Sequence, residues 1–186
     1  MFVGKSKLQY LPIGYKYATM QLFVYGTLCD PEIRDLVMGR RHGQVYPATL
    51  RGYIAVQIIG AKYPVLQKKS SGRVGGLLLS GFDFVTLTRI SHYESVEYRV
   101  VHLQPIVFCH GPVEALLFLA RRTVASSQRP WRLKEWQYRH KIRELPQIDS
   151  WMARWRPGNP IDSRGLHFAC RQIDLPREIY LGQVYN

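Results

Sequence analysis

Cysteine is scarce in this sequence, and its scarcity argues against two kinds of stabilising site. The three cysteines are odd in number and far apart, at Cys29, Cys109 and Cys170. This pattern favours free buried thiols over a disulfide framework or a zinc site. The six histidines show no metal-ligand spacing such as H-x-x-x-H. We therefore expect no metal ion and no structural disulfide.

Long hydrophobic runs are also missing. The longest apolar stretches, such as Val113 to Ala120, are much shorter than the roughly 20 residues that a membrane helix needs. Residues 1–18 lack the apolar stretch and the small-residue cleavage site of a secretory signal. We expect a cytoplasmic protein without a membrane span.

Acidic residues are few beside basic ones, with 13 Asp and Glu against 26 Lys and Arg, a formal net charge of +13. Residues 121–156 hold ten of the basic residues and three of the acidic ones, which is more than half of the excess. Four tryptophans interleave with them, so one hypothesis is a nucleic-acid or other anionic partner bound by phosphate contacts and base stacking. The other interpretation is an amphipathic helix that packs its tryptophans inward. We favour it because no known nucleic-acid module accompanies the basic segment.

The chain has 186 residues, 46% of them hydrophobic, which suffices for one globular domain with a sizeable core. Clusters of Gly, Ser and Lys between residues 60 and 81 predict loops around residues 73–79. Apolar and aromatic runs predict strands at residues 20–28, 44–59 (one strand or two), 98–108, 113–120 and 177–185.

Helices are predicted from their starting residues. Asp30 is a suitable N-cap and Pro31 a suitable first helical residue, so a helix should follow the first strand. Asp83 is the N-cap of a second expected helix. The basic segment after Arg121 has tryptophans at helix-like intervals, with Ser150 as a candidate N-cap.

The first strand ends in an unusual way, at the segment Tyr25 to Leu28. A glycine at a strand exit lets the backbone come close to a ligand, and successive N–H groups there can form an anion-binding nest. Gly26 could therefore help to hold a carboxylate. The alternative is that it only permits a turn.

Glu94 lies on an apolar helical stripe. Phe84, Leu87 and Ile90 share that stripe by their spacing. A carboxyl group there loses solvation, which raises its pKa and suits a group that both takes and gives a proton. The alternatives are that Glu94 is capped, paired with Arg99 or simply solvated.

Together these segments resemble the γ-glutamylcyclotransferase-like family, including its AIG2-like and γ-glutamylamine cyclotransferase branches. Members typically show Y-G-[ST]-L at the first strand exit, a glycine before a later strand, and L-D-x-[FY]-E-G followed by Y-x-R. The resemblance covers residues 20–120. The matching positions are Tyr25-Gly26-Thr27-Leu28, Gly76, Tyr93-Glu94 and Tyr98-Arg99.

The resemblance implies a mixed α/β (α+β) fold, with a small barrel-like mixed sheet and surrounding helices. It suggests an N-terminal extension at residues 1–19 and a family core at 20–120. Residues 121–186 would then be a basic helical segment and tail that complete the same domain.

The resemblance also implies an enzyme that releases 5-oxoproline from a small γ-glutamyl substrate without a cofactor. In the family, the substrate's own α-amine attacks its γ-carbonyl. The main chain of Tyr25, Gly26, Thr27 and Leu28 would bind the amino-acid end of the substrate, and Glu94 would be the catalytic acid and base. Glu97 is a natural comparison residue.

Two positions depart from the family pattern. Ser91 stands where the family often has Asp, and Ser95 stands where it often has Gly. Neither change removes the acid and base, but both leave open a different loop shape and a different γ-glutamyl or amide substrate. The leaving amine and the oligomeric state are not predicted.

Overall fold

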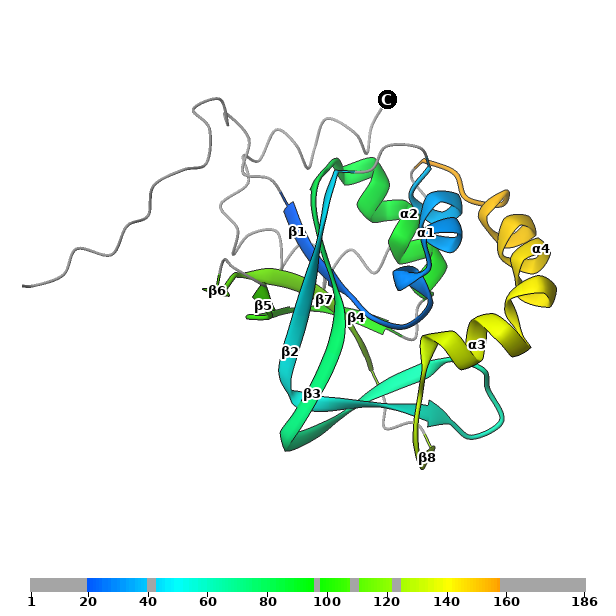
Figure 1. Cartoon of the computed structure of the whole chain (residues 1–186). Helices are drawn as coiled ribbons and strands as arrows, with labels where there is room; N and C mark the ends of the chain where they lie inside the picture. Colours follow the sequence, from blue (N-terminus) through cyan, green and yellow to red (C-terminus); the bar gives the residue numbers. More distant parts are fainter. Residues whose placement is uncertain (1–19, 40–42, 96–97, 108–110, 122–124, 158–186) are drawn as a thin grey trace, which may run out of the picture.

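The protein's structure is a computed structural model that describes residues 20–39, 43–95, 98–107, 111–121 and 125–157 (Figure 1). The expected extension at residues 1–19, the expected strand at 177–185 and the comparison residue Glu97 lie outside these residues, as do Cys109 and Cys170. Within the described ranges, no helix is both long and apolar enough to cross a membrane.

A single mixed sheet of eight strands organises the described chain, in the order β4-β7-β1-β3-β2-β5-β6, with β8 paired to β2. The β1–β7 pair is parallel, and the other pairs are antiparallel. The strands are β1 (Met20–Val24), β2 (Gln44–Ile58), β3 (Pro64–Phe82), β4 (Tyr98–Leu103), β5 (Ile106–Val107), β6 (Gly111–Pro112), β7 (Ala115–Ala120) and β8 (Ser126–Pro130).

The hairpin of β2 and β3 is the longest feature of the sheet, and it bends near its middle. Its register shifts between Arg51 and Tyr53, and Gly52 between them has a φ of 80°. A bulge of this kind strengthens the local twist and redirects the strand. The two halves of β2 consequently pair with different strands, the first with β5 and the second with β8.

The predicted loops around residues 73–79 are wrong, because this stretch lies inside β3. Polar residues and glycines usually indicate a loop, but here β2 supplies backbone hydrogen-bond partners along the whole stretch. Gly76 has a packing role there, since a Cβ atom at this position would lie 2.3 Å from the Val24 carbonyl oxygen. The glycine therefore allows β1 and β3 to approach closely.

The helices lie together on one side of the sheet (Figure 1). They are α1 (Pro31–Met38), α2 (Phe84–Glu94), α3 (Leu133–Arg139) and α4 (Lys141–Met152), with a short 3-10 helix η1 (Gly26–Cys29) before α1. The predicted caps of the first two helices are confirmed, because the side chains of Asp30 and Asp83 accept backbone hydrogen bonds at their starts. The mixed α/β class, with a barrel-like mixed sheet and packed helices, is confirmed as well.

Strand β1 is buried on both faces, because its side chains alternate between two hydrophobic clusters. Leu22 and Val24 face the cluster that includes the helices. Phe23 faces the other cluster, with Leu78 and Leu117. The strand exit that begins at Tyr25 is thus fixed from both sides.

The basic segment after Arg121 differs in part from its prediction. Ser126–Pro130 forms strand β8, and Ser150 lies inside α4 and does not cap a helix. Trp136 is buried in the core. The Trp131 indole N–H donates to the Lys62 carbonyl oxygen at 3.0 Å.

A buried ion pair anchors the helices α3 and α4 to the start of α1. The Asp30 carboxylate, which is 0% exposed, accepts hydrogen bonds from Lys141 Nζ at 2.8 and 2.9 Å and from Gln137 Nε2 at 2.6 Å. Burial alone would raise the pKa of Asp30, but these donors outweigh it and hold the pKa below its usual value. The segment 133–152 is consequently tied to the turn that follows β1.

We expect Lys141→Met to lower the free energy of unfolding by about 1.5–3 kcal/mol, the usual contribution of a hydrogen bond to a charged group. The substitution leaves the Asp30 carboxylate buried without its cation. Lys134→Met is the control, because Lys134 is exposed on α3. Urea unfolding at neutral pH measures both variants, and equal small losses would contradict the anchoring role of Lys141.

Candidate active site

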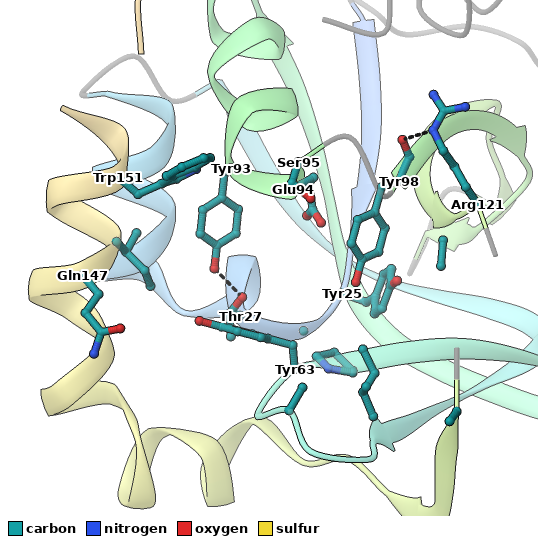
Figure 2. A pocket seen from close by; sticks show the side chains of 17 residues that line it. Tyr25, Thr27, Tyr63, Tyr93, Glu94, Ser95, Tyr98, Arg121, Gln147 and Trp151 are labelled. Atoms are coloured by element: carbon teal, nitrogen blue, oxygen red, sulfur yellow. Dashed lines mark hydrogen bonds between the residues drawn. The ribbon is translucent and has the colours of Figure 1, made fainter. Parts of the chain in front are cut away.

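One pocket of about 920 Å³ opens where β1, α2 and α4 come together (Figure 2). Three of the predicted substrate-binding residues and the predicted catalytic residue line it. The full lining is Tyr25, Gly26, Thr27, Ile58, Ala61, Tyr63, Pro64, Tyr93, Glu94, Ser95, Tyr98, Ala120, Arg121, Ala125, Gln147, Ile148 and Trp151.

The strand exit reaches the pocket through a sharp change of backbone direction. Tyr25 is extended, and Gly26, the first residue of η1, has a φ of 72°. A Cβ atom on Gly26 would lie 2.8 Å from Pro64 Cγ, so glycine is required by conformation and by close packing. Leu28 differs from its neighbours, because its side chain is buried in the core and does not line the pocket.

Glu94 is the last residue of α2, and its side chain is half-buried. Burial raises the pKa of its carboxyl to about 8. Among the described residues, no hydrogen bond or ion pair holds this carboxyl, and Arg99, the partner considered from the sequence, is exposed. Glu94 is therefore positioned to exchange a proton near neutral pH.

A hydrogen bond joins the two predicted halves of the site. The hydroxyl oxygens of Thr27 and Tyr93 lie 2.7 Å apart, which ties the strand exit to the end of α2. Burial raises the pKa of Tyr25 well above its usual value, and the nearby Glu94 and Tyr98 raise it further. The Tyr25 phenol thus stays a neutral donor beside Glu94 (Figure 2).

Sequence reasoning missed a third side of the pocket, at the turn between β2 and β3. The Tyr63 hydroxyl donates to Glu144 Oε2 at 2.7 Å, and Lys62 pairs with the same carboxylate. Glu144 is only 3% exposed. This contact connects the turn to α4, which adds Ile148 and Trp151 to the lining. The only signal of this wall in the sequence is the helical spacing of Ile148 and Trp151 from Glu144.

Ser95 has a backbone conformation that glycine usually occupies. Its φ is 68° and its ψ is 175°, and it is the only residue other than glycine with positive φ in the described part of the chain. A side chain in this region costs about 1–3 kcal/mol. The conformation explains why a glycine is common here in the family pattern, and Ser95 lines the pocket directly after Glu94.

Solved structures of similar fold include the solution structures of At5g39720.1 and At3g28950.1, both from Arabidopsis thaliana. The first has a TM-score of 0.54 at 22% identity, covering 75% of this chain and 94% of that chain. The second has a TM-score of 0.52 at 21% identity, covering 71% and 81%. A structure named gamma-glutamyl cyclotransferase has a TM-score of 0.52 at 11% identity, covering 82% and 99%. These likenesses show a gamma-glutamyl cyclotransferase-like fold.

Curated relatives include two Arabidopsis thaliana proteins. AIG2-like protein C is 33% identical over 81 residues, which are 44% of this chain and 46% of the relative. Protein AIG2 C is 28% identical over 85 residues, which are 46% of this chain and 51% of the relative. The chain thus spans about half the length of the curated relatives it matches.

The family described as "Gamma-glutamyl cyclotransferase, AIG2-like" matches residues 22–138. This range contains the strand exit, the Glu94 region and the sheet that positions them. The chain therefore belongs to the AIG2-like gamma-glutamyl cyclotransferase family.

Proposed function

We propose that this protein is a γ-glutamyl cyclotransferase that cleaves a γ-glutamyl amide to 5-oxoproline and a free amine. The observation that carries the proposal is the position of Glu94, a half-buried carboxyl without a partner among the described residues, in one pocket with Tyr25, Gly26 and Thr27. Burial raises its pKa to about 8. A group with this pKa can accept and return a proton near neutral pH. The location we propose is cytoplasmic.

The reaction uses a nucleophile that the substrate already carries. The Glu94 carboxylate takes a proton from the α-ammonium group, and the freed nitrogen attacks the γ-carbonyl carbon to form the ring bond. The bond between this carbon and the amide nitrogen then breaks, and Glu94 returns its proton to the departing amine. The attacking nitrogen gives its second proton to the regenerated Glu94 carboxylate, which passes this proton to the amine product or to water, and the neutral ring amide remains. Holding the amine against the carbonyl can supply about 7–11 kcal/mol of the barrier.

The pocket lining supports the other parts of this reaction. Amide N–H groups of the strand exit, from Tyr25 to Thr27, can bind the substrate's α-carboxylate. The neutral Tyr25 phenol can donate to negative charge that develops on the carbonyl oxygen. Cys29 is a poor rival nucleophile, because burial raises the pKa of its thiol to about 11 and it stays protonated at neutral pH.

The alternative function, nucleic-acid or anionic-partner binding through residues 121–156, has weaker support. Base stacking needs exposed aromatic faces. Trp136 is buried, the Trp151 ring stacks on His92, and the Arg89 guanidinium lies 5.1 Å from the Trp155 ring centre. Binding that weakens steeply with salt would favour this alternative.

We expect Glu94→Gln to fold and to bind γ-glutamyl compounds, with kcat reduced at least about 10²-fold, the lower end of acid–base contributions. Glutamine keeps the shape of the side chain but accepts no proton. Glu114→Gln is the control, since Glu114 is exposed and outside the pocket. The measurement is 5-oxoproline release from γ-glutamyl amino acids, γ-glutamyl-ε-lysine and glutathione. Near-normal turnover by Glu94→Gln would show that the site is assigned wrongly.

We expect kcat/KM to fall tenfold per pH unit below about 8, because the free enzyme must have Glu94 ionised and burial raises its pKa to about 8. The rise of kcat with pH should occur at lower pH than the rise of kcat/KM, since the ammonium group of the bound substrate lowers the pKa of the Glu94 carboxyl. The residual activity of Glu94→Gln should not show this tenfold fall in kcat/KM per pH unit.

Stability gives an independent readout of the same group. Folding favours the protonated form of Glu94, so its contribution is lost as pH rises from about 4.5 in the unfolded chain to about 8 in the folded one. The unfolding free energy of the wild type should fall relative to Glu94→Gln across this window. A constant difference would contradict the raised pKa.

A further inference from the structure

We propose that α4 forms the binding site for the leaving amine and selects an uncharged, apolar substituent on it. This inference rests on the proposed cyclotransferase function. It concerns the wall of the pocket made by Gln147, Ile148 and Trp151, to which sequence reasoning assigned no role in the γ-glutamyl site.

One face of α4 makes this wall. Positions 144, 147, 148 and 151 follow the i, i+3, i+4, i+7 spacing of a single helical face. At the first of them, the buried Glu144 holds the Tyr63 hydroxyl at 2.7 Å, so the next turns of the helix must also face the pocket. Ile148 is 5% exposed, and Trp151 extends from α4 toward Tyr93 (Figure 2).

The two ends of the pocket differ in their relation to the family. The strand exit and Glu94 lie within residues 22–138, the part that matches the family. Helix α4 begins at Lys141, beyond that match. Ring closure of the glutamyl group is common to all γ-glutamyl substrates, so we assign it to the strand exit and Glu94, within the family match. The leaving amine differs from one substrate to another, so we assign it to α4.

The lining side chains from α4, which are Gln147, Ile148 and Trp151, carry no charge, and Trp151 is held in one orientation. Its indole N–H donates to the His92 carbonyl oxygen at 3.0 Å, and its ring stacks on the His92 ring with centroids 4.7 Å apart. The Arg154 guanidinium lies 5.8 Å from the Trp151 ring centre, which disfavours a cationic amine. Among the described residues, Arg121 is the cationic side chain of the lining, and it lies at the opposite end of the view from Trp151 (Figure 2). Arg154 does not line the pocket, so a carboxylate at α4 would meet no cation of the described lining.

Size supports the same substrate class. The pocket volume of about 920 Å³ is near the upper end of small-molecule sites, which span roughly 300–1,000 Å³. A glutamyl group alone leaves much of this space unfilled. An aromatic or branched apolar amine would fill the remainder against Ile148 and Trp151.

Two matched pairs of substrates test the charge preference. γ-Glutamyl phenethylamide and γ-glutamylphenylalanine differ only in a carboxylate, and γ-glutamyl butylamide and γ-glutamylputrescine differ in a terminal ammonium group. We expect kcat/KM for 5-oxoproline release to be at least about tenfold higher for the uncharged member of each pair. Equal or reversed values would overturn the inference.

Variants of α4 test the residue assignment. Trp151→Ala should lower the ratio of kcat/KM for γ-glutamyl phenethylamide to kcat/KM for γ-glutamyl methylamide about tenfold, because only the larger amine reaches the ring that the substitution removes. Ile142→Ala is the control, because Ile142 is 87% exposed and does not line the pocket. If the methylamide turns over but Trp151→Ala does not discriminate, only this inference fails. If the folded protein turns over none of these amides, the proposed function fails and this inference fails with it.

We also infer that the Ser95 hydroxyl contacts the glutamyl part of the substrate. A serine in a glycine conformation, with a φ of 68°, is retained at a cost in stability, and strain of this kind concentrates at functional sites. Ser95 follows Glu94 directly and lines the same pocket. Its effect should therefore be independent of the leaving amine, in contrast to that of Trp151.

Two substitutions separate the hydroxyl from the strain. Ser95→Ala removes the hydroxyl and keeps the strained Cβ atom, whereas Ser95→Gly removes both. We expect both variants to lower kcat/KM about tenfold for the methylamide and the phenethylamide alike, and only Ser95→Gly to unfold at higher urea. Wild-type kcat/KM in Ser95→Ala would overturn this role.

Discussion

The buried carboxylate of Asp30 connects the parts of the chain that surround the pocket. It accepts hydrogen bonds from the Glu32 and Ile33 amides, which begins α1 directly after the strand exit. It also accepts from Gln137 and Lys141, at α3 and the start of α4. A single side chain thereby sets the distance between the turn after β1 and the helix that forms the opposite wall. Without it, the site would lose the fixed relation between its two ends.

Among the described residues, three carboxyl groups have shifted pKa values, and their surroundings give them different roles. Asp30 and Glu144 each have a lysine partner, Lys141 and Lys62, and both have lowered pKa values because hydrogen bonds outweigh burial. Such ion pairs hold separate segments of the fold together. Glu94 has no described partner, and burial raises its pKa. A carboxyl that is neither paired nor fully hydrated is poised for proton transfer, and this contrast separates it from the structural carboxyls.

The sequence predicted the local features well, because they depend on near neighbours. The caps at Asp30 and Asp83 and the place of Glu94 on the α2 stripe follow from spacings of a few residues. The long β3 strand was missed, because its Gly, Ser and Lys residues become a strand only when β2 pairs with them. The wall formed by α4 was missed for a related reason. Glu144 contacts Tyr63 across 81 positions of the chain, and no local pattern records such a contact.

The pocket separates the chemistry from the choice of amine, and the packing explains how both can coexist in one small domain. The position of α4 is set by Lys141 at its start and by Glu144 one turn later. Trp151, near its other end, contributes to the lining without carrying these contacts. The residue at position 151 can therefore differ without releasing the start of the helix, and its contacts with His92 connect the end of α4 to the end of α2. Selectivity for the amine then depends on a helix that the buried carboxylates hold in place, while proton transfer depends on a strand exit and a helix end that α4 does not form.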